Sequence, residues 1–345
     1  MYMLHVFGKN PSSAIQRHFT RLANYQNGRF QNLGGVKFSP GEAPMGKMLL
    51  DFLRKPRTVT PSRPLPSVQT DLHHPATEQP TIIWFGHSSY LIQARGLNIL
   101  VDPVFSGAAS PVSFAVKAYA GADAYTVADL PPIDVLVLTH DHYDHLDYTT
   151  VAELRPKVQH VVTPLGVSGH LWAWGYAPEQ LTELNWHETA EPVPGVQLTA
   201  TPAQHMSGRS LAPQRTLWAS YVLQLDDYRL FLGGDSGYGP HFRAIGEQYG
   251  PFDVALLENG QYNLSWHAIH CLPEETAQAA QDLGARLLLP VHWAKFTLAY
   301  HPWNEPIQLV LTAADAAGLP VTVPRIGEAY TLGTPPKREA WWAFE

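Results

Sequence analysis

The sequence has very little cysteine and no long hydrophobic run. Its single cysteine, Cys271, excludes an intramolecular disulfide and leaves the cellular compartment open. No stretch of about 18 apolar residues occurs, so no segment is expected to span a membrane. The first ten residues lack the basic start and apolar stretch of a secretory signal. We therefore expect a cytoplasmic protein.

Positive charge is also scarce. Only 15% of the 345 residues are charged, and 30 Asp and Glu outnumber 23 Lys and Arg, which gives a formal net charge of −7. A chain without a basic patch is not expected to bind nucleic acid. Its hydrophobic content of 45% and its length are sufficient for a sizeable globular core.

Histidine, in contrast, is abundant, with 17 in the chain. The densest group ends the string VLVLTHDHYDH at residues 135–145, in the spacing H-x-H-x-D-H. Residues 135–139 are apolar and β-branched and predict a buried strand, and residues 146–154 predict a helix. So many imidazoles and carboxylates after a buried strand indicate a bound divalent cation, and Zn²⁺ suits mixed nitrogen and oxygen ligands. The alternative is a solvated polar loop with chance histidines.

The spacing favours two metal ions. Alternate residues of a turn point the same way, so His140 and His142 can converge on one ion while Asp144 and His145 turn toward a second. Further along the chain, His205, Asp235 and His292 each follow an apolar run.

This string resembles the signature of the metallo-β-lactamase superfamily of dinuclear metallohydrolases. The resemblance implies three further ligands at strand ends, a His, an Asp and a His, in the order in which the sequence supplies them. Asp235 is the best candidate to bridge both ions, because a carboxylate has two oxygens to share. The implied fold is an α/β protein of the αββα-sandwich type. The implied ligand set is His140, His142, Asp144, His145, His205, Asp235 and His292.

Other residues are expected around this site. Asp102 follows residues 97–101, and the resemblance implies that it holds a ligand histidine through the other ring nitrogen. His87 either faces the cleft or is a half-buried, hydrogen-bonded histidine. His270 precedes a predicted helix at residues 273–283, where the resemblance implies that it stabilises the attacked group or protonates the leaving group.

Weaker candidates are more distant from the motif. His267 is a second choice after His270. Arg209 and Arg215 follow His205 and could hold an anionic group of a substrate, although ordinary surface arginines are the alternative. Residues 105–125 could form a rim or lid over the metal ions.

We expect two parts in the chain: an N-terminal extension at residues 1–80 and a hydrolase domain at residues 81–345. Within the extension, residues 12–24 and 44–54 predict helices, and the second could pack on the body or touch a membrane surface. Six prolines between residues 56 and 80 predict an extended strap. The apolar tail is expected to dock on the body or on another subunit, so a homo-oligomer is possible.

A narrower resemblance extends over most of the chain. Several strings look like the N-acylphosphatidylethanolamine-hydrolysing phospholipase D group, which is similar to the ascorbate-6-phosphate lactonase branch. They occupy residues 25–32, 101–106, 139–147, 202–205, 234–240, 250–253 and 292–296.

This resemblance implies a zinc-dependent phosphodiesterase that uses a metal-bridging hydroxide, with Asp144 and His270 as catalytic residues. The expected partner is a small molecule or a phospholipid, with peripheral membrane contact conceivable. The alternative is a lactonase or amidase acting on a small polar metabolite. A metal-binding scaffold without turnover is disfavoured because every ligand is intact. Diiron redox chemistry is disfavoured because the second motif position is His142 rather than a carboxylate.

Overall fold

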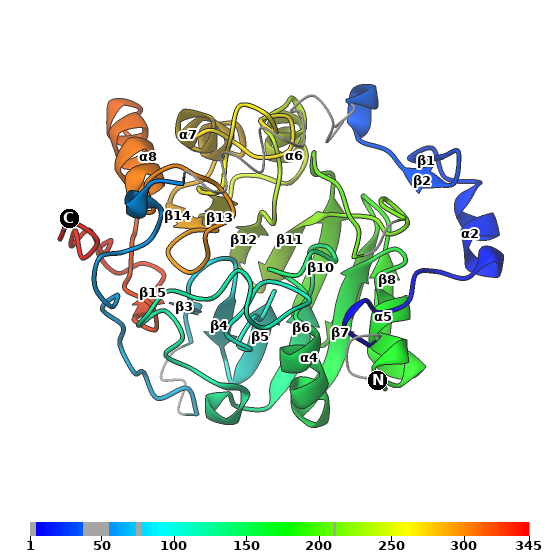
Figure 1. Cartoon of the computed structure of the whole chain (residues 1–345). Coiled ribbons are helices and arrows are strands. Elements are labelled where there is room, and N and C mark those ends of the chain that lie inside the picture. The colour runs from blue at the N-terminus through cyan, green and yellow to red at the C-terminus, as the bar shows by residue number, and fades with distance from the viewer. Residues whose placement is uncertain (1–4, 37–54, 74–77, 210–211, 345) are drawn as a thin grey trace.

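Two β-sheets lie face to face between two layers of helices in this computed structural model, which describes residues 5–36, 55–73, 78–209 and 212–344 (Figure 1). The first sheet has the strand order β15 (Ala329–Thr331), β3 (Thr81–Trp84), β4 (Tyr90–Ala94), β5 (Leu97–Val101), β6 (Ile133–Val137), β7 (Val158–Pro164) and β8 (Leu181–Leu184). The second has the order β14 (Leu288–Val291), β13 (Val254–Glu258), β12 (Tyr228–Leu232), β11 (Ser220–Leu225), β10 (Val196–Thr201) and β9 (Thr189–Val193).

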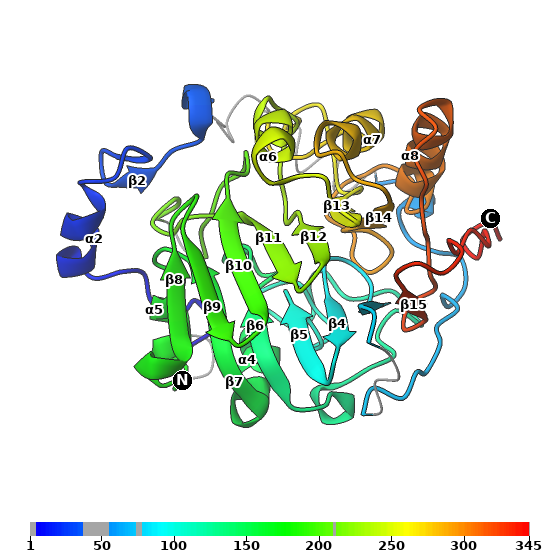
Figure 2. The ribbon, with the colours of Figure 1, turned by 180° about the vertical axis from the view of Figure 1, so that it is seen from behind.

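Helices cover the outer face of each sheet. The first sheet carries α4 (Tyr148–Leu154) and α5 (Ser168–Ala173), and the second carries α6 (His241–Tyr249), α7 (Pro273–Asp282) and α8 (Glu305–Ala316). Short 3₁₀ turns lie at Leu33–Gly35, Arg57–Val59, Val127–Asp129, Arg155–Lys157 and Pro178–Gln180. Seen from behind, the edge strands β8 and β9 lie side by side and bring the two sheets together (Figure 2). The expected αββα sandwich is therefore confirmed.

Continuous apolar runs form strands that are buried on both faces. In β5, Ile99 and Val101 point into the core between the sheets, whereas Leu100 packs under the outer helices. The same alternation holds in β6 for Val135 and Leu136. Each fully buried side chain of this kind stabilises the fold by about 1.5–3 kcal/mol. Double burial explains why these segments read as apolar runs rather than as an alternating pattern.

Strand direction decides where the chain presents its polar groups. In the first sheet β5 and β6 pair in parallel, and in the second β12, β13 and β14 do so. Their carboxyl ends therefore lie at one edge of the sandwich. The loops that leave this edge carry the candidate metal ligands, as in other open α/β sheets.

Several predicted boundaries shift by a few residues. The strand expected at 135–139 ends at Val137, because the backbone N–H of Thr139 donates to Asp102 Oδ1 at 2.9 Å instead of continuing the ladder. The helix expected from residue 146 begins at Tyr148, where the Asp147 side chain caps it. The helix expected at 12–24 is shorter, α2 (Ser13–Phe19), and the chain continues into a small hairpin, β1 (Tyr25–Gln26) and β2 (Arg29–Phe30). The predicted helix at 44–54 lies outside the described residues.

Two described segments of the first eighty residues lie on different sides of the sandwich. Residues 5–36, called the N-terminal arm below, lie beside β8, while residues 55–73 run past α8 and β15 (Figure 1). The latter segment is largely extended, as its prolines predict, and the Val68 N–H donates to the Ile326 carbonyl at 2.8 Å. Whether residues 81–345 form a separate domain stays a prediction. Within the described ranges, no helix has the length and hydrophobicity needed to cross a membrane.

The C-terminal tail docks on the body, as expected. Trp341 and Trp342 are buried, and the Trp341 ring stacks on Trp293 with the ring centroids 5.1 Å apart. Trp293 in turn stacks on Trp84 of β3, and it directly follows the candidate ligand His292. The tail therefore supports the segment that carries this ligand.

We expect Trp341→Ala to lower the free energy of unfolding by about 3 kcal/mol, because it leaves a cavity beside Trp293. Trp172→Ala is the matched control: Trp172 is 56% exposed, and its loss should change the value by less than about 1 kcal/mol. Urea unfolding followed by circular dichroism measures both. Equal losses in the two variants would show that the tail contributes no core packing.

Candidate metal centre

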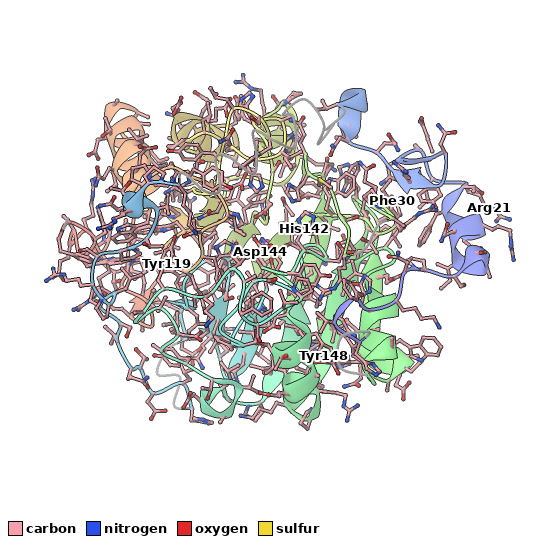
Figure 3. The ribbon with its side chains drawn as sticks, viewed as in Figure 1. Arg21, Phe30, Tyr119, His142, Asp144 and Tyr148 are labelled. Carbon is pink, nitrogen blue, oxygen red and sulfur yellow. The ribbon has the colours of Figure 1, made fainter. Side chains whose placement is uncertain are left out.

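The predicted ligands converge from both sheets. His140, His142, Asp144 and His145 lie in the loop after β6, His205 follows β10, Asp235 follows β12, and His292 follows β14. Figure 3 shows His142 and Asp144 close together at the centre of the molecule, between the helical layers. The set belongs to overlapping groups of side chains whose ligand atoms lie within 4.8 Å of one another.

A first cluster gathers around one oxygen of Asp235. The Nδ1 atom of His142 lies 3.0 Å from His140 Nε2 and 3.2 Å from His205 Nε2. The Oδ2 atom of Asp235 lies 3.9 Å from His140 Nε2 and 3.7 Å from His205 Nε2. Three imidazole nitrogens and one carboxylate oxygen thus face a common point.

A second cluster gathers around the other oxygen of the same carboxylate. Asp235 Oδ1 lies 3.2 Å from His145 Nε2 and 3.1 Å from His292 Nδ1. His292 Nδ1 also lies 2.9 Å from Ser88 Oγ, so Nε2 is the His292 atom left for a metal ion. Asp144 Oδ2 lies 3.6 Å from His145 Nε2. The two oxygens of Asp235 therefore divide between the two clusters, which is the arrangement expected of a bridging ligand.

Unpaired polar atoms show that these residues fit a metal ion. His145 Nε2, His292 Nε2 and Asp235 Oδ1 are buried, and none has a hydrogen-bond partner within the described part of the chain. A buried polar atom without a partner costs about 1–3 kcal/mol. A divalent cation would satisfy all three, and nitrogen and carboxylate donors are the set that Zn²⁺ accepts.

Protonation states agree with this interpretation. Burial lowers the pKa of His140, His205 and His292 well below the usual value, so these rings are neutral at pH 7 and keep a lone pair for a metal. Burial would raise the pKa of Asp144 and Asp235, but neighbouring histidines hold both well below the usual range.

His145 behaves differently from the other rings. Burial lowers its pKa, but Asp235, Asp144 and Asp102 together raise it well above the usual value. Three carboxylates around one ring attract positive charge, whether as a proton on the ring or as a metal ion beside it.

Asp102 orients the rings from below, as predicted. Its Oδ2 accepts from His145 Nδ1 at 2.7 Å and from the Thr139 hydroxyl at 2.6 Å. Thr139 Oγ1 in turn lies 3.0 Å from His140 Nδ1. One carboxylate thereby fixes the tautomers of two candidate ligands and leaves their Nε2 atoms free.

His87 contacts the site more closely than expected. It is fully buried rather than half-buried, and its Nε2–H donates to Asp144 Oδ2 at 2.9 Å. Its ring lies 4.1 Å from that of His292 between centroids. His87 therefore holds one oxygen of Asp144 in place.

His270 lies beside the candidate ligands, with 12% of its side chain exposed, and it has a partner that sequence reasoning missed. Its Nδ1 lies 2.6 Å from Oε2 of Glu258, at the end of β13. Burial alone would lower the pKa of His270, but the Glu258 carboxylate raises it to about 9. The His270 ring lies 5.0 Å from that of His205 between centroids. Glu258 follows an apolar run just as the ligands do, and this was the signal that could have identified it.

Four other residues have structural contacts instead of facing the clusters. Asp141 is buried and accepts from Thr216 Oγ1 at 2.8 Å, and its other neighbours include His170. The guanidinium of Arg209 is buried and donates to the carbonyls of Val6 and Asp141, so the idea that it holds a substrate anion is wrong. Arg215 donates to the Gly28 carbonyl, and the exposed His267 pairs with Glu275.

Close backbone approach is required at the turn that carries Asp235. Gly234 has φ +60°, and a Cβ at this position would lie 2.9 Å from Cβ of Thr139. Any other residue would therefore push the Asp235 turn away from the motif loop.

Residues 105–125 attach to the segment that follows His292, because the Tyr119 N–H donates to the Lys295 carbonyl at 2.8 Å. Their role as a rim stays a prediction.

Comparison with known proteins agrees with this geometry. The family described as "Beta-lactamase superfamily domain" matches residues 97–293, a range that contains all seven predicted ligands. The chain belongs to the metallo-β-lactamase superfamily. It is a metal-dependent hydrolase of this superfamily, and groups of His and Asp side chains that could hold a metal ion lie within the matched range.

Individual relatives are similar over different lengths. An uncharacterized protein of Mycobacterium tuberculosis is 36% identical over 336 residues, which cover 96% of this chain and 90% of the relative. N-acyl-phosphatidylethanolamine-hydrolyzing phospholipase D 1 of Caenorhabditis elegans is 32% identical over 228 residues, covering 62% of this chain and 64% of that protein. This chain thus matches less than two thirds of the nematode enzyme.

A solved structure supports the fold. Igni18, a metallo hydrolase from Ignicoccus hospitalis, has a TM-score of 0.58 and 22% sequence identity, and the match covers 74% of this chain and 99% of that one.

We expect Asp102→Asn to weaken Zn²⁺ binding by about 10- to 100-fold, because an amide has one acceptor oxygen. It cannot replace both Oδ2, which accepts from His145 and the Thr139 hydroxyl, and Oδ1, which accepts from the Thr139 N–H. Competition with a chromogenic chelator measures the affinity. Asp134→Asn is the matched control, since Asp134 caps the backbone N–H of Asn98 in the same sheet without contacting a ligand. Unchanged affinity in Asp102→Asn would contradict the orienting role.

Proposed function

We propose that this protein is a dinuclear zinc hydrolase that cleaves a phosphodiester, in the manner of N-acylphosphatidylethanolamine-hydrolysing phospholipase D. The proposal assigns His140, His142, His205 and Asp235 to one ion. It assigns Asp144, His145, His292 and Asp235 to the other. The observation that carries it is the division of the two Asp235 oxygens between the two clusters.

When bound, two zinc ions would lower the pKa of a shared water and offset the charge that develops on the attacked group. The protein side chains supply orientation and protons. Asp144, fixed by His87, accepts a hydrogen bond from the attacking water and aims it at the substrate. His270, paired with Glu258, is the group placed to donate a proton to the leaving oxygen.

The substrate class is inferred from relatives. The nematode protein named above is an N-acyl-phosphatidylethanolamine-hydrolyzing phospholipase D, and a yeast protein of the same description is 32% identical over 250 residues. That match covers 68% of this chain and 52% of the yeast protein. A phosphodiester is the bond common to such substrates, so it is the first chemistry to test. Peripheral membrane contact and oligomerisation stay predictions.

The test pairs metal analysis with turnover on the same sample. We expect two zinc ions per chain and hydrolysis of bis(p-nitrophenyl) phosphate. Asp235→Asn should reduce kcat by more than about 100-fold, the upper limit for outer-shell partners of a metal, and should lower the zinc content. Asp227→Asn, in the exposed turn of the same hairpin, should behave as the wild type.

The other outcomes are equally informative. Two ions without phosphodiester hydrolysis, but with turnover of a lactone or amide panel, would replace the proposed substrate class by carbonyl compounds. One ion or none in protein purified without chelators would refute the shared Asp235 site.

We expect Glu258→Gln to lower kcat by about 10- to 100-fold with little change in KM, because the carboxylate holds His270 for proton donation rather than binding substrate. Steady-state kinetics on bis(p-nitrophenyl) phosphate measures both constants. Glu275→Gln is the matched control. Glu275 pairs at 3.0 Å with the exposed His267, which lies on the loop that also carries His270. A rise in KM with unchanged kcat would assign Glu258 to substrate binding instead.

A further inference from the structure

The N-terminal arm reaches the metal centre through a single amide. Asn32 comes just after β2 and is only 6% exposed. Its Oδ1 accepts from the backbone N–H of His205 at 3.0 Å, and its Nδ2–H donates to the His205 carbonyl at 2.9 Å. Both backbone groups of a candidate metal ligand are therefore bonded by one side chain that lies 173 residues earlier.

This double contact fixes the ligand in a way that its ring contacts alone do not. The Nδ1–H of His205 donates to the carbonyl of Ile269 at 2.9 Å, which leaves Nε2 to face His142 and Asp235. The ring contact sets the tautomer. The Asn32 amide sets the height and direction of the backbone from which the ring projects, much as a neighbouring strand would.

The Asn32 side chain is itself held from several sides. The indole N–H of Trp218 donates to Asn32 Oδ1 at 3.1 Å. Two residues earlier, the Phe30 N–H donates to the Gln214 carbonyl at 2.9 Å, and the Phe30 ring is fully buried. Figure 3 shows Phe30 on the side of the arm that faces the body and Arg21 at its outer side.

Aromatic packing makes the arm a firm support. The Phe30 ring lies 4.9 Å from that of Tyr25 and 5.2 Å from that of Phe19, between centroids. The Arg215 guanidinium donates to the Gly28 carbonyl at 3.0 Å and thereby ties the β1–β2 turn to the loop that follows His205. The arm has its own small core and several anchors on the body.

We propose that Asn32 is a positioning residue for the first metal ion and that the N-terminal arm is a working part of the metal centre. The inference rests on the proposed function, in which His205 is a ligand of that ion. Residue 32 lies outside the range matched by the superfamily domain, residues 97–293. The N-terminal arm, which lies outside this matched range, therefore contributes a contact to the metal centre.

The test measures cobalt binding, which needs no substrate. We expect the wild-type protein, freed of metal, to bind two Co²⁺ ions and to show the visible absorption of coordinated Co²⁺. Asn32→Leu removes both bonds to His205 with little change in side-chain size. It should weaken one of the two sites by about 10- to 100-fold, alter the visible spectrum, and leave the second site within about threefold of the wild type.

Asn24→Leu is the matched control. Asn24 also joins the arm to the body, because its Nδ2–H donates to Asn185 Oδ1 at 2.9 Å, but it does not bond a ligand. Both Co²⁺ affinities should stay at the wild-type values in this variant. If Asn24→Leu weakens the same site as strongly, general docking of the arm explains the effect, and the specific role of Asn32 is refuted.

A second variant covers the case in which Asn32→Leu does not fold. Asn32→Asp keeps an acceptor for the His205 and Trp218 N–H groups and loses the amide donor to the His205 and Val36 carbonyls. It should weaken the same single site to a smaller extent. Wild-type Co²⁺ affinities and spectrum in a folded Asn32 variant would overturn the inference alone. Fewer than two Co²⁺ in the wild-type protein would overturn the proposed function, and the inference with it.

Discussion

The structure depends on the burial of three carboxyl groups in one small volume. Asp102, Asp144 and Asp235 are all nearly inaccessible to water. An isolated carboxylate is costly to bury, and the cost falls only when positive charge and hydrogen bonds surround it. The five candidate ligand histidines stay mostly neutral because burial also opposes their protonation. A bound cation would supply the positive charge that the buried carboxylates need and would also accept the lone pairs of the neutral histidines. The groups whose burial costs folding free energy are therefore the groups that favour a metal ion at this site.

Backbone hydrogen bonds next to the site join the loop after β3 in the first sheet to the loop after β14 in the second. The His87 N–H donates to the Trp293 carbonyl at 2.9 Å, and the His292 N–H donates to the His87 carbonyl at 2.8 Å. His87, Asp102 and His292 have φ values of 52°, 41° and 65°, a left-handed conformation that costs non-glycine residues about 1–3 kcal/mol each. Strain of this size persists only where surrounding bonds over-determine the backbone. Next to His292, the Trp293 ring stacks on both Trp84 and Trp341 and adds packing to these backbone bonds.

The sequence predicts the candidate ligands by a local rule. Each follows an apolar run, and parallel strands bring their carboxyl ends to one edge. The direction of a side chain within a loop is not local. Asp141 sits between two predicted ligands in the sequence, but its carboxylate turns away to Thr216 and His170. Arg209 follows the His205 strand end and still binds backbone carbonyls of Val6 and Asp141, because the arm supplies acceptors that no local pattern reveals. The fold class followed from family resemblance, whereas the strand ends followed from the residues themselves.

The contact between Asn32 and His205 shows why ligand identity and metal affinity are specified at different ranges of the sequence. Ligand identity needs only the right residue after a strand. Affinity depends on whether ligand atoms are held within about 0.5 Å of the geometry that the ion requires. That precision comes from groups that bond the ligand backbone and the far nitrogen of each ring, and they can come from any part of the chain. The hydrogen bond between Asp102 and His145 spans 43 residues of the sequence. The bonds of His205 to Ile269 and to Asn32 span 64 and 173 residues. A motif therefore predicts that a metal binds, while packing of distant segments determines how tightly it binds.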